Sequence, residues 1–201
     1  MTRRRVTRPL VAGATFLVAL ALVQVVGAAP RDTKSMVLRL RDLPPRFALE
    51  SSGYRTNATL QREEKAEPRK DYRALGRISG YAASFEKHGL VGLAHVDSTA
   101  STYKTTRGAQ RSWSQSVAQV KNGASGFRFT RLSVGGLGTR AALFKATTTS
   151  SGVSFDVYVL YWRYRAVFAS VTGGGISGGV RRATIVDLAR KQQRRIQRVV
   201  G

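Results

Sequence analysis

Cysteine is absent from this 201-residue chain. Its absence excludes disulfide bonds, thiol nucleophiles and thiolate metal ligands. Histidine is nearly as scarce, with two residues, and they form neither an H-x-x-x-H spacing nor an H-E-x-x-H motif. No D-x-D-x-D loop of the kind that binds calcium occurs either. The sequence therefore predicts no metal centre and no cofactor.

Acidic residues are also few. The chain carries 11 Asp and Glu against 34 Lys and Arg, which gives a formal net charge of +23. An excess of this size favours polyanionic partners, such as nucleic acid, anionic lipid surfaces or acidic envelope polymers. It carries no information about the fold.

Residues 1–28 have the pattern of an export signal. Four arginines precede an apolar run from Leu10 to Val26, and the run ends in Val26-Gly27-Ala28, small or apolar residues of the kind that a signal peptidase reads. The alternative is a retained membrane anchor, because the apolar run is near the lower length limit for a membrane span. Removal of the signal leaves 30 basic and 11 acidic residues, a net charge of +19. The basic character therefore belongs to the domain as well.

The remaining chain reads as a linker over residues 29–36 and one domain over residues 37–201. Runs rich in β-branched and aromatic residues predict strands. They cover Arg46–Tyr54, Arg77–Glu86, Leu90–Thr105, Phe127–Leu132, Arg140–Thr147, Ser154–Trp162 and Arg165–Thr172. Apolar residues at helical spacing predict helices over 107–121 and 179–200. Short connections favour antiparallel pairing. We therefore expect an α+β domain, a twisted antiparallel β-sheet flanked by amphipathic helices.

The glycine-rich stretch VTGGGISGGVRRA, residues 171–183, satisfies G-x-G-x-x-G with Gly173, Gly175 and Gly178. A dinucleotide site needs an acidic residue about 20 positions further on, and a P-loop needs Gly-Lys-[Ser/Thr]. The only later acid is Asp187, and no Gly-Lys-[Ser/Thr] occurs. The glycines are better explained as a sharp turn from strand to helix, with Ser177 as a possible helix cap.

The last predicted helix has an apolar face, with its basic residues on the opposite arc. An Arg pair also stands at its start. Such an arc can neutralise phosphates or lie on an anionic membrane, although it can equally be a solvated face. The predicted polyanion-binding residues are Arg181, Arg182, Arg190, Lys191, Arg194, Arg195 and Arg198.

The segment YVLYWRYRAVF, residues 158–168, interleaves aromatic and basic side chains. On a hairpin these residues could stack on bases or sugars, but alternate positions would also pack in the core. The possible ligand contacts are Tyr161, Trp162, Arg163 and Tyr164.

His95 and Asp97 are two residues apart, which places both side chains on one face of a strand. A hydrolase triad also needs a nucleophile and a base in mutual reach. A surface His–Asp pair is the simpler interpretation, and His88 reads as a solvated turn residue. The sequence therefore predicts a protein that is not an enzyme. An unrecognised activity would depend on His95 or Asp97.

A set of short motifs in fixed order resembles a group of exported bacterial single-domain proteins of largely unknown function. The motifs are LRDLPPRF at 40–47, GRISGY at 76–81, LGTRA at 137–141, FASVT at 168–172 and LARKQQRRI at 188–196. This group is similar in layout to PsbP-like proteins, and the resemblance implies an antiparallel sheet flanked by helices. Arg46 departs from the pattern, which usually has glycine there. The resemblance implies no catalytic residues.

These observations predict an exported, strongly basic, non-enzymatic module of the cell envelope that binds an anionic envelope polymer or an anionic membrane surface. The alternative is a small-ligand or protein-binding domain that uses the sheet face and the late β-hairpin. Nucleic acid is not an expected partner, because export would separate this protein from the nucleic acid of the cell. The oligomeric state is left open.

Overall fold

The computed structural model describes residues 32–63, 69–87, 92–123 and 127–201. Within them the chain forms one seven-stranded sheet in the order β1-β2-β3-β7-β6-β5-β4, and every neighbouring pair is antiparallel. The strands are β1 (Phe47–Tyr54), β2 (Arg77–Lys87), β3 (Leu93–Tyr103), β4 (Thr130–Leu132), β5 (Arg140–Ser150), β6 (Val153–Tyr164) and β7 (Val167–Ile176).

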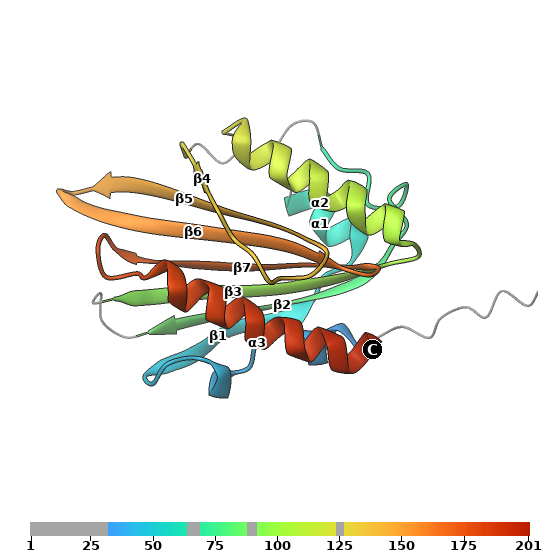
Figure 1. The fold of residues 1–201 in the computed structure, drawn as a ribbon, viewed down its shortest axis with the longest axis horizontal. Helices are drawn as coiled ribbons and strands as arrows, with labels where there is room; N and C mark the ends of the chain where they lie inside the picture. The colour runs from blue at the N-terminus through green and yellow to red at the C-terminus, as the bar shows by residue number, and fades with distance from the viewer. Residues whose placement is uncertain (1–31, 64–68, 88–91, 124–126) are drawn as a thin grey trace, which may run out of the picture.

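Three α-helices accompany the sheet in the described ranges: α1 (Asn57–Glu63), α2 (Thr106–Lys121) and α3 (Arg182–Val200). The α+β layout predicted from the sequence is wrong in its balance, because strands dominate the described chain and α1 spans only seven residues. Figure 1 shows α3 lying over one face of the sheet and running at a shallow angle to the strands.

The two faces of the sheet carry different cores, because side chains alternate along each strand. Trp162 packs with Ile185 and Ile196 of α3 in the larger cluster. Its neighbour Tyr161 points the other way and packs against the cluster that contains Trp113 of α2. The faces are called below the α3 face and the α2 face.

The N-terminal described segment folds onto the α3 face. It forms two short 3₁₀ turns, η1 (Thr33–Met36) and η2 (Leu40–Asp42). Met36 is fully buried in the larger core cluster. Residues 33–36 of the expected linker are thus part of the folded unit, while the predicted signal at residues 1–28 lies outside the described residues.

The glycine-rich stretch is structural in this fold. Gly173 to Gly175 lie within β7, and Gly178 turns the chain with a φ of +83°. The carboxylate of Asp156, which is 1% exposed, accepts hydrogen bonds from Ser177 Oγ and the Gly178 amide. Ser177 therefore stabilises the turn and does not cap α3, whose N-cap is Arg181. This arrangement fits the turn interpretation.

Candidate functional site

The α2 face is only partly covered. Helix α2 packs on β6, β7 and one end of β3, and a polar cleft of about 610 Å³ opens over β1, β2 and the remainder of β3. The side chains that line it are mainly hydroxyl and carboxyl groups. The lining residues are Glu50, Ser51, Ser52, Gly53, Tyr54, Arg55, Ala82, Ala83, Ser84, Asp97, Thr99 and Thr172.

Strand pairing brings two carboxylates of this cleft onto one hydroxyl. Ser84 lies opposite Asp97 in the β2–β3 ladder, and the β1–β2 register brings Glu50 beside it. Ser84 Oγ lies 2.9 Å from Glu50 Oε2 and 2.8 Å from Asp97 Oδ1. A serine hydroxyl has one hydrogen and can donate to only one of them at a time. The two carboxylates therefore share a single donor at this point.

His95 extends the same network along β3. Its Nε2 lies 2.8 Å from Asp97 Oδ2, and its Nδ1 lies 3.9 Å from Glu86 Oε1. The hydrogen bond to Asp97 raises the pKa of His95 above its ordinary 6.5. Burial works to raise the pKa of Asp97, but the hydrogen bond and charge of His95, together with the Ser84 hydrogen bond and the charge of Arg55, lower that pKa below 3.8. Each charge therefore favours the ionised form of the other.

Glu50, Glu86 and His95 could also hold a metal ion. Each offers one ligand atom, and these atoms lie within 4.8 Å of one another. Asp97 would then be the carboxylate that orients the histidine through its other ring nitrogen. Three of the 11 acidic residues of this basic chain, Glu50, Glu86 and Asp97, thus gather with one histidine at the cleft.

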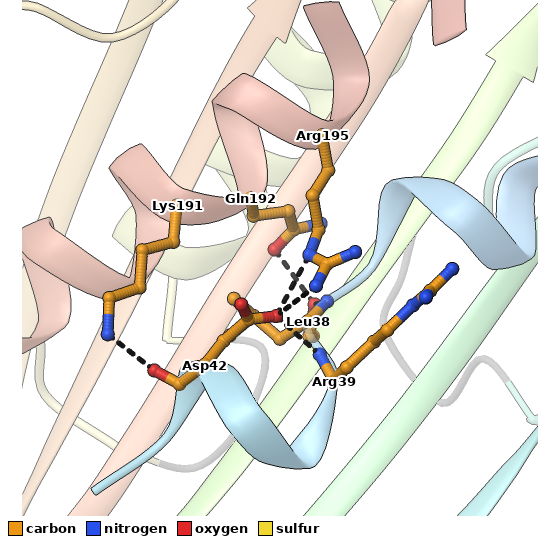
Figure 2. Close-up of polar contacts among 7 residues, drawn as sticks. Leu38, Arg39, Asp42, Lys191, Gln192 and Arg195 are labelled. Carbon is orange, nitrogen blue, oxygen red and sulfur yellow. Dashed lines mark hydrogen bonds and ion pairs between the residues drawn. The ribbon is translucent and has the colours of Figure 1, made fainter. Parts of the chain in front are cut away.

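The predicted polyanion-binding residues do not form one free arc. Arg195 is 5% exposed, and its Nη2 lies 2.8 Å from Asp42 Oδ2, so its placement on the solvated side of the helix is wrong. Lys191 Nζ donates to the Asp42 carbonyl oxygen at 2.6 Å. Figure 2 shows both side chains holding the turn η2.

The other five basic residues remain exposed. Arg190 pairs with Asp187 at 3.1 Å, and Arg182 donates to the Ser133 carbonyl oxygen. Arg181, Arg194 and Arg198 have no ion pair within the described residues. The exposed positive surface of α3 is therefore smaller than the sequence predicts.

The late hairpin does not present its aromatic residues as a ligand surface. Trp162 is 0% exposed and lies in the core under α3, so its prediction as a ligand contact is wrong. Burial raises the pKa of Tyr161 to about 12, and the ring packs 5.6 Å from Phe168. Tyr164 packs against the larger core cluster, while Arg163 donates to the Arg165 carbonyl oxygen.

A second concavity lies on the α3 face, beside η1 and η2. It has a volume of about 460 Å³ and is lined mainly by apolar side chains, among them Leu49 and Phe85. Leu40 and Leu49 at its rim are 48% and 52% exposed. Its lining offers no network of ionised groups comparable with that of the polar cleft.

No known family model matches the chain, and no curated protein matches it in sequence. The solved structures similar in fold include the extracellular domain of PknH from Mycobacterium tuberculosis. The TM-score is 0.60 at 11% identity, over 83% of this chain and 95% of that chain. The predicted PsbP-like layout is therefore wrong, and the similar fold is that of the PknH extracellular domain. Within the described ranges, no helix is long and apolar enough to cross a membrane.

The sequence identified part of this site. The two-residue spacing of His95 and Asp97 placed them on one face of a strand, as the structure shows. Glu50, Ser84 and Glu86 were missed because they reach the site through the pairing of β1 and β2 with β3.

Proposed function

We propose that this protein is an exported binding module, without catalytic activity, that holds a small polar solute in the cleft on the α2 face. The solute carries a positively charged ammonium group, which lies between Glu50 and Asp97. Export is the interpretation that the leader sequence favours, and the fold is one that an extracellular domain also adopts.

The shared hydroxyl of Ser84 is the observation that carries this proposal. Two carboxylates converge on the hydroxyl of Ser84, and Asp97 has His95 as a further partner. Acceptor pairs of this kind are stabilised by additional N–H donors and by positive charge. An ammonium group has three donors, so it can satisfy both carboxylates at once. The hydroxyl-lined walls suit the polar remainder of a solute.

A second candidate is binding of an anionic envelope polymer by α3. The observation in its favour is the exposure of Arg194 and Arg198, which have no ion pair within the described residues. These residues lie four positions apart and therefore on one side of the helix. Contacts of this kind weaken with added salt.

The cleft proposal is tested by titrating tetraalanine amide into the full chain by isothermal calorimetry. This probe has an ammonium group and no carboxylate. We expect binding that weakens at least about tenfold in Glu50→Gln and in Asp97→Asn, because each change removes one charged partner. Asp187→Asn is the matched control, since it removes an exposed carboxylate on α3.

Two outcomes would contradict the proposal. One is an affinity that Glu50→Gln, Asp97→Asn and Asp187→Asn leave unchanged. The other is binding that requires a divalent metal ion and disappears with a chelator, which would assign Glu50, Glu86 and His95 to a metal instead.

A further inference from the structure

Arg77 is a buried cation that faces a cavity. The residue is 5% exposed and lines a cavity of about 150 Å³ on the α2 face. A volume of this size admits a group such as a carboxylate. Arginine stays charged in proteins even where burial lowers its pKa, as it does here.

The partners of Arg77 in the described residues are all neutral. Its Nε donates to Ser101 Oγ at 3.1 Å and its Nη1 to Asn57 Oδ1 at 2.8 Å, and the guanidinium lies 5.8 Å from the Tyr72 ring centroid. No carboxylate forms an ion pair with Arg77 in that part of the chain. A buried charge is costly without a counter-charge, and a bound anion would supply it.

The other lining groups of this cavity also suit an anion. Lys70 is 9% exposed, and its Nζ lies 3.0 Å from Ser116 Oγ. Tyr103 and Ser112 contribute hydroxyl groups, which are joined by a 2.6 Å hydrogen bond. Cations and hydroxyls are the donors that carboxylate recognition uses.

The cavity and the polar cleft form adjacent parts of one groove, because Arg55, Ala82 and Thr99 line both. Asp97 lies at the end of the groove that carries the protein's acidic side chains. Ser101, the hydrogen-bond partner of Arg77, lies at the other end. Ser101 lies four positions after Asp97 in β3, a distance of about 13 Å at the rise of a strand. An extended chain of four residues spans about the same length.

We propose that the groove binds a zwitterionic ligand of peptide-like length, with its carboxylate at Arg77. Its ammonium group lies at Glu50 and Asp97, so this inference rests on the proposed function and adds the second charged group of the ligand. Positive and negative charge at the two ends of the groove fix the orientation of the ligand.

Three probes separate the two ends: tetraalanine, its C-terminal amide and its N-acetyl derivative. Each is titrated into the full chain and into Arg77→Gln. In the unaltered protein we expect tetraalanine to bind about tenfold more tightly than the amide. In Arg77→Gln we expect the two to bind equally. Arg73→Gln is the matched control, because it removes one exposed arginine from the same segment.

The failures of the two proposals are distinguishable. Equal affinity for tetraalanine and its amide in the unaltered protein overturns the Arg77 inference and leaves the ammonium site intact. Loss of amide binding with retained binding of N-acetyl-tetraalanine overturns the ammonium site alone. N-acetyl-tetraalanine must also lose affinity in Arg77→Gln and keep it in Asp97→Asn.

A second measurement covers the case in which Arg77→Gln does not fold. The side-chain Nε resonance of Arg77 is followed in arginine-labelled, unaltered protein during addition of N-acetyl-tetraalanine. A saturable shift at Arg77 supports the inference, and an unmoved Arg77 resonance at high probe concentration overturns it.

Discussion

The electrostatics of the cleft depend on the pair His95 and Asp97. Both side chains are half-buried, and their 2.8 Å contact lowers the pKa of the acid and raises that of the base. Each shift stabilises the folded state over a defined pH range. The contribution of His95 is fully present below pH 6.5, its unfolded pKa, and is lost as pH rises through the raised folded pKa.

We therefore expect Asp97→Asn to lower the pKa of His95 toward 6.5, because the largest cause of the upward shift is removed. The pKa is measured from the imidazole proton resonance across a pH series.

His95→Gln should reduce the free energy of unfolding at pH 5.5 more than at pH 8.5. A larger effect at pH 8.5 would contradict the assigned pairing.

The two residues of this pair were predictable from the sequence, but their partners were not. Spacing within one strand fixes the face on which His95 and Asp97 lie. The position of Ser84 depends on the β2–β3 register, which is set by loops and by burial of the other face. The buried state of Arg77 was equally inaccessible, because it arises from the packing of segments that are distant in the sequence.

The glycines of β7 allow close approach of the chain segments around the strand. A Cβ on Gly175 would overlap the Gly92 carbonyl oxygen, whereas one on Gly174 would lie 3.5 Å from the Asp156 carbonyl oxygen, an ordinary contact. The requirement for glycine in this stretch is therefore specific to position.

Gly175→Ala should reduce the free energy of unfolding by about 1–3 kcal/mol, the usual cost of a forced overlap in a packed region. Gly174→Ala is the control and should change it by less than about 0.5 kcal/mol. Both values come from urea unfolding. Equal effects at the two positions would show that close packing at Gly175 is not what requires glycine.

Helix α3 is tied to the N-terminal segment by its own basic residues. Arg195 pairs with Asp42, and Gln192 accepts a hydrogen bond from Ser98 Oγ, which in turn accepts one from the Leu38 amide (Figure 2). Helical periodicity assigns Arg195 to the polar arc, but it does not show that another segment covers that arc. This is why the prediction of a free arginine was wrong there.

Asp42→Asn should lower the free energy of unfolding by roughly 3 kcal/mol, because it leaves the buried guanidinium of Arg195 without its counter-charge. Asp187→Asn breaks an exposed pair and should cost less than about 1 kcal/mol. Chemical unfolding of both variants measures the difference. Similar small losses would mean that the Asp42–Arg195 pair does not anchor η2.

The net positive charge of the whole chain predicts that polyanion binding depends on salt concentration. If the exposed arginines of α3 bind a polyanion, affinity for heparin should fall steeply between low and physiological salt and should fall further in the double variant Arg194→Gln/Arg198→Gln. Fluorescence anisotropy with labelled heparin measures both effects. An affinity that neither salt nor the double variant changes would contradict polyanion binding by α3.

The strands were largely predictable, and the overall architecture was not. The predicted strand at Arg77–Glu86 and the helix at 107–121 agree with β2 and α2 within one residue at each end. The spacing of apolar residues identifies such elements, because each element buries one face. Strand order depends on contacts between distant segments, such as β3 with β7, so the resemblance to PsbP-like proteins misassigned the fold.

The most direct test of a ligand-binding cleft is chemical-shift mapping of the backbone amides of the full, isotopically labelled chain during titration with tetraalanine. Binding in the groove predicts saturable shifts centred on Ser84, Asp97 and Thr99, with α3 unaffected. Shifts confined to Arg194 and Arg198, or no saturable shift in the groove, would contradict the account.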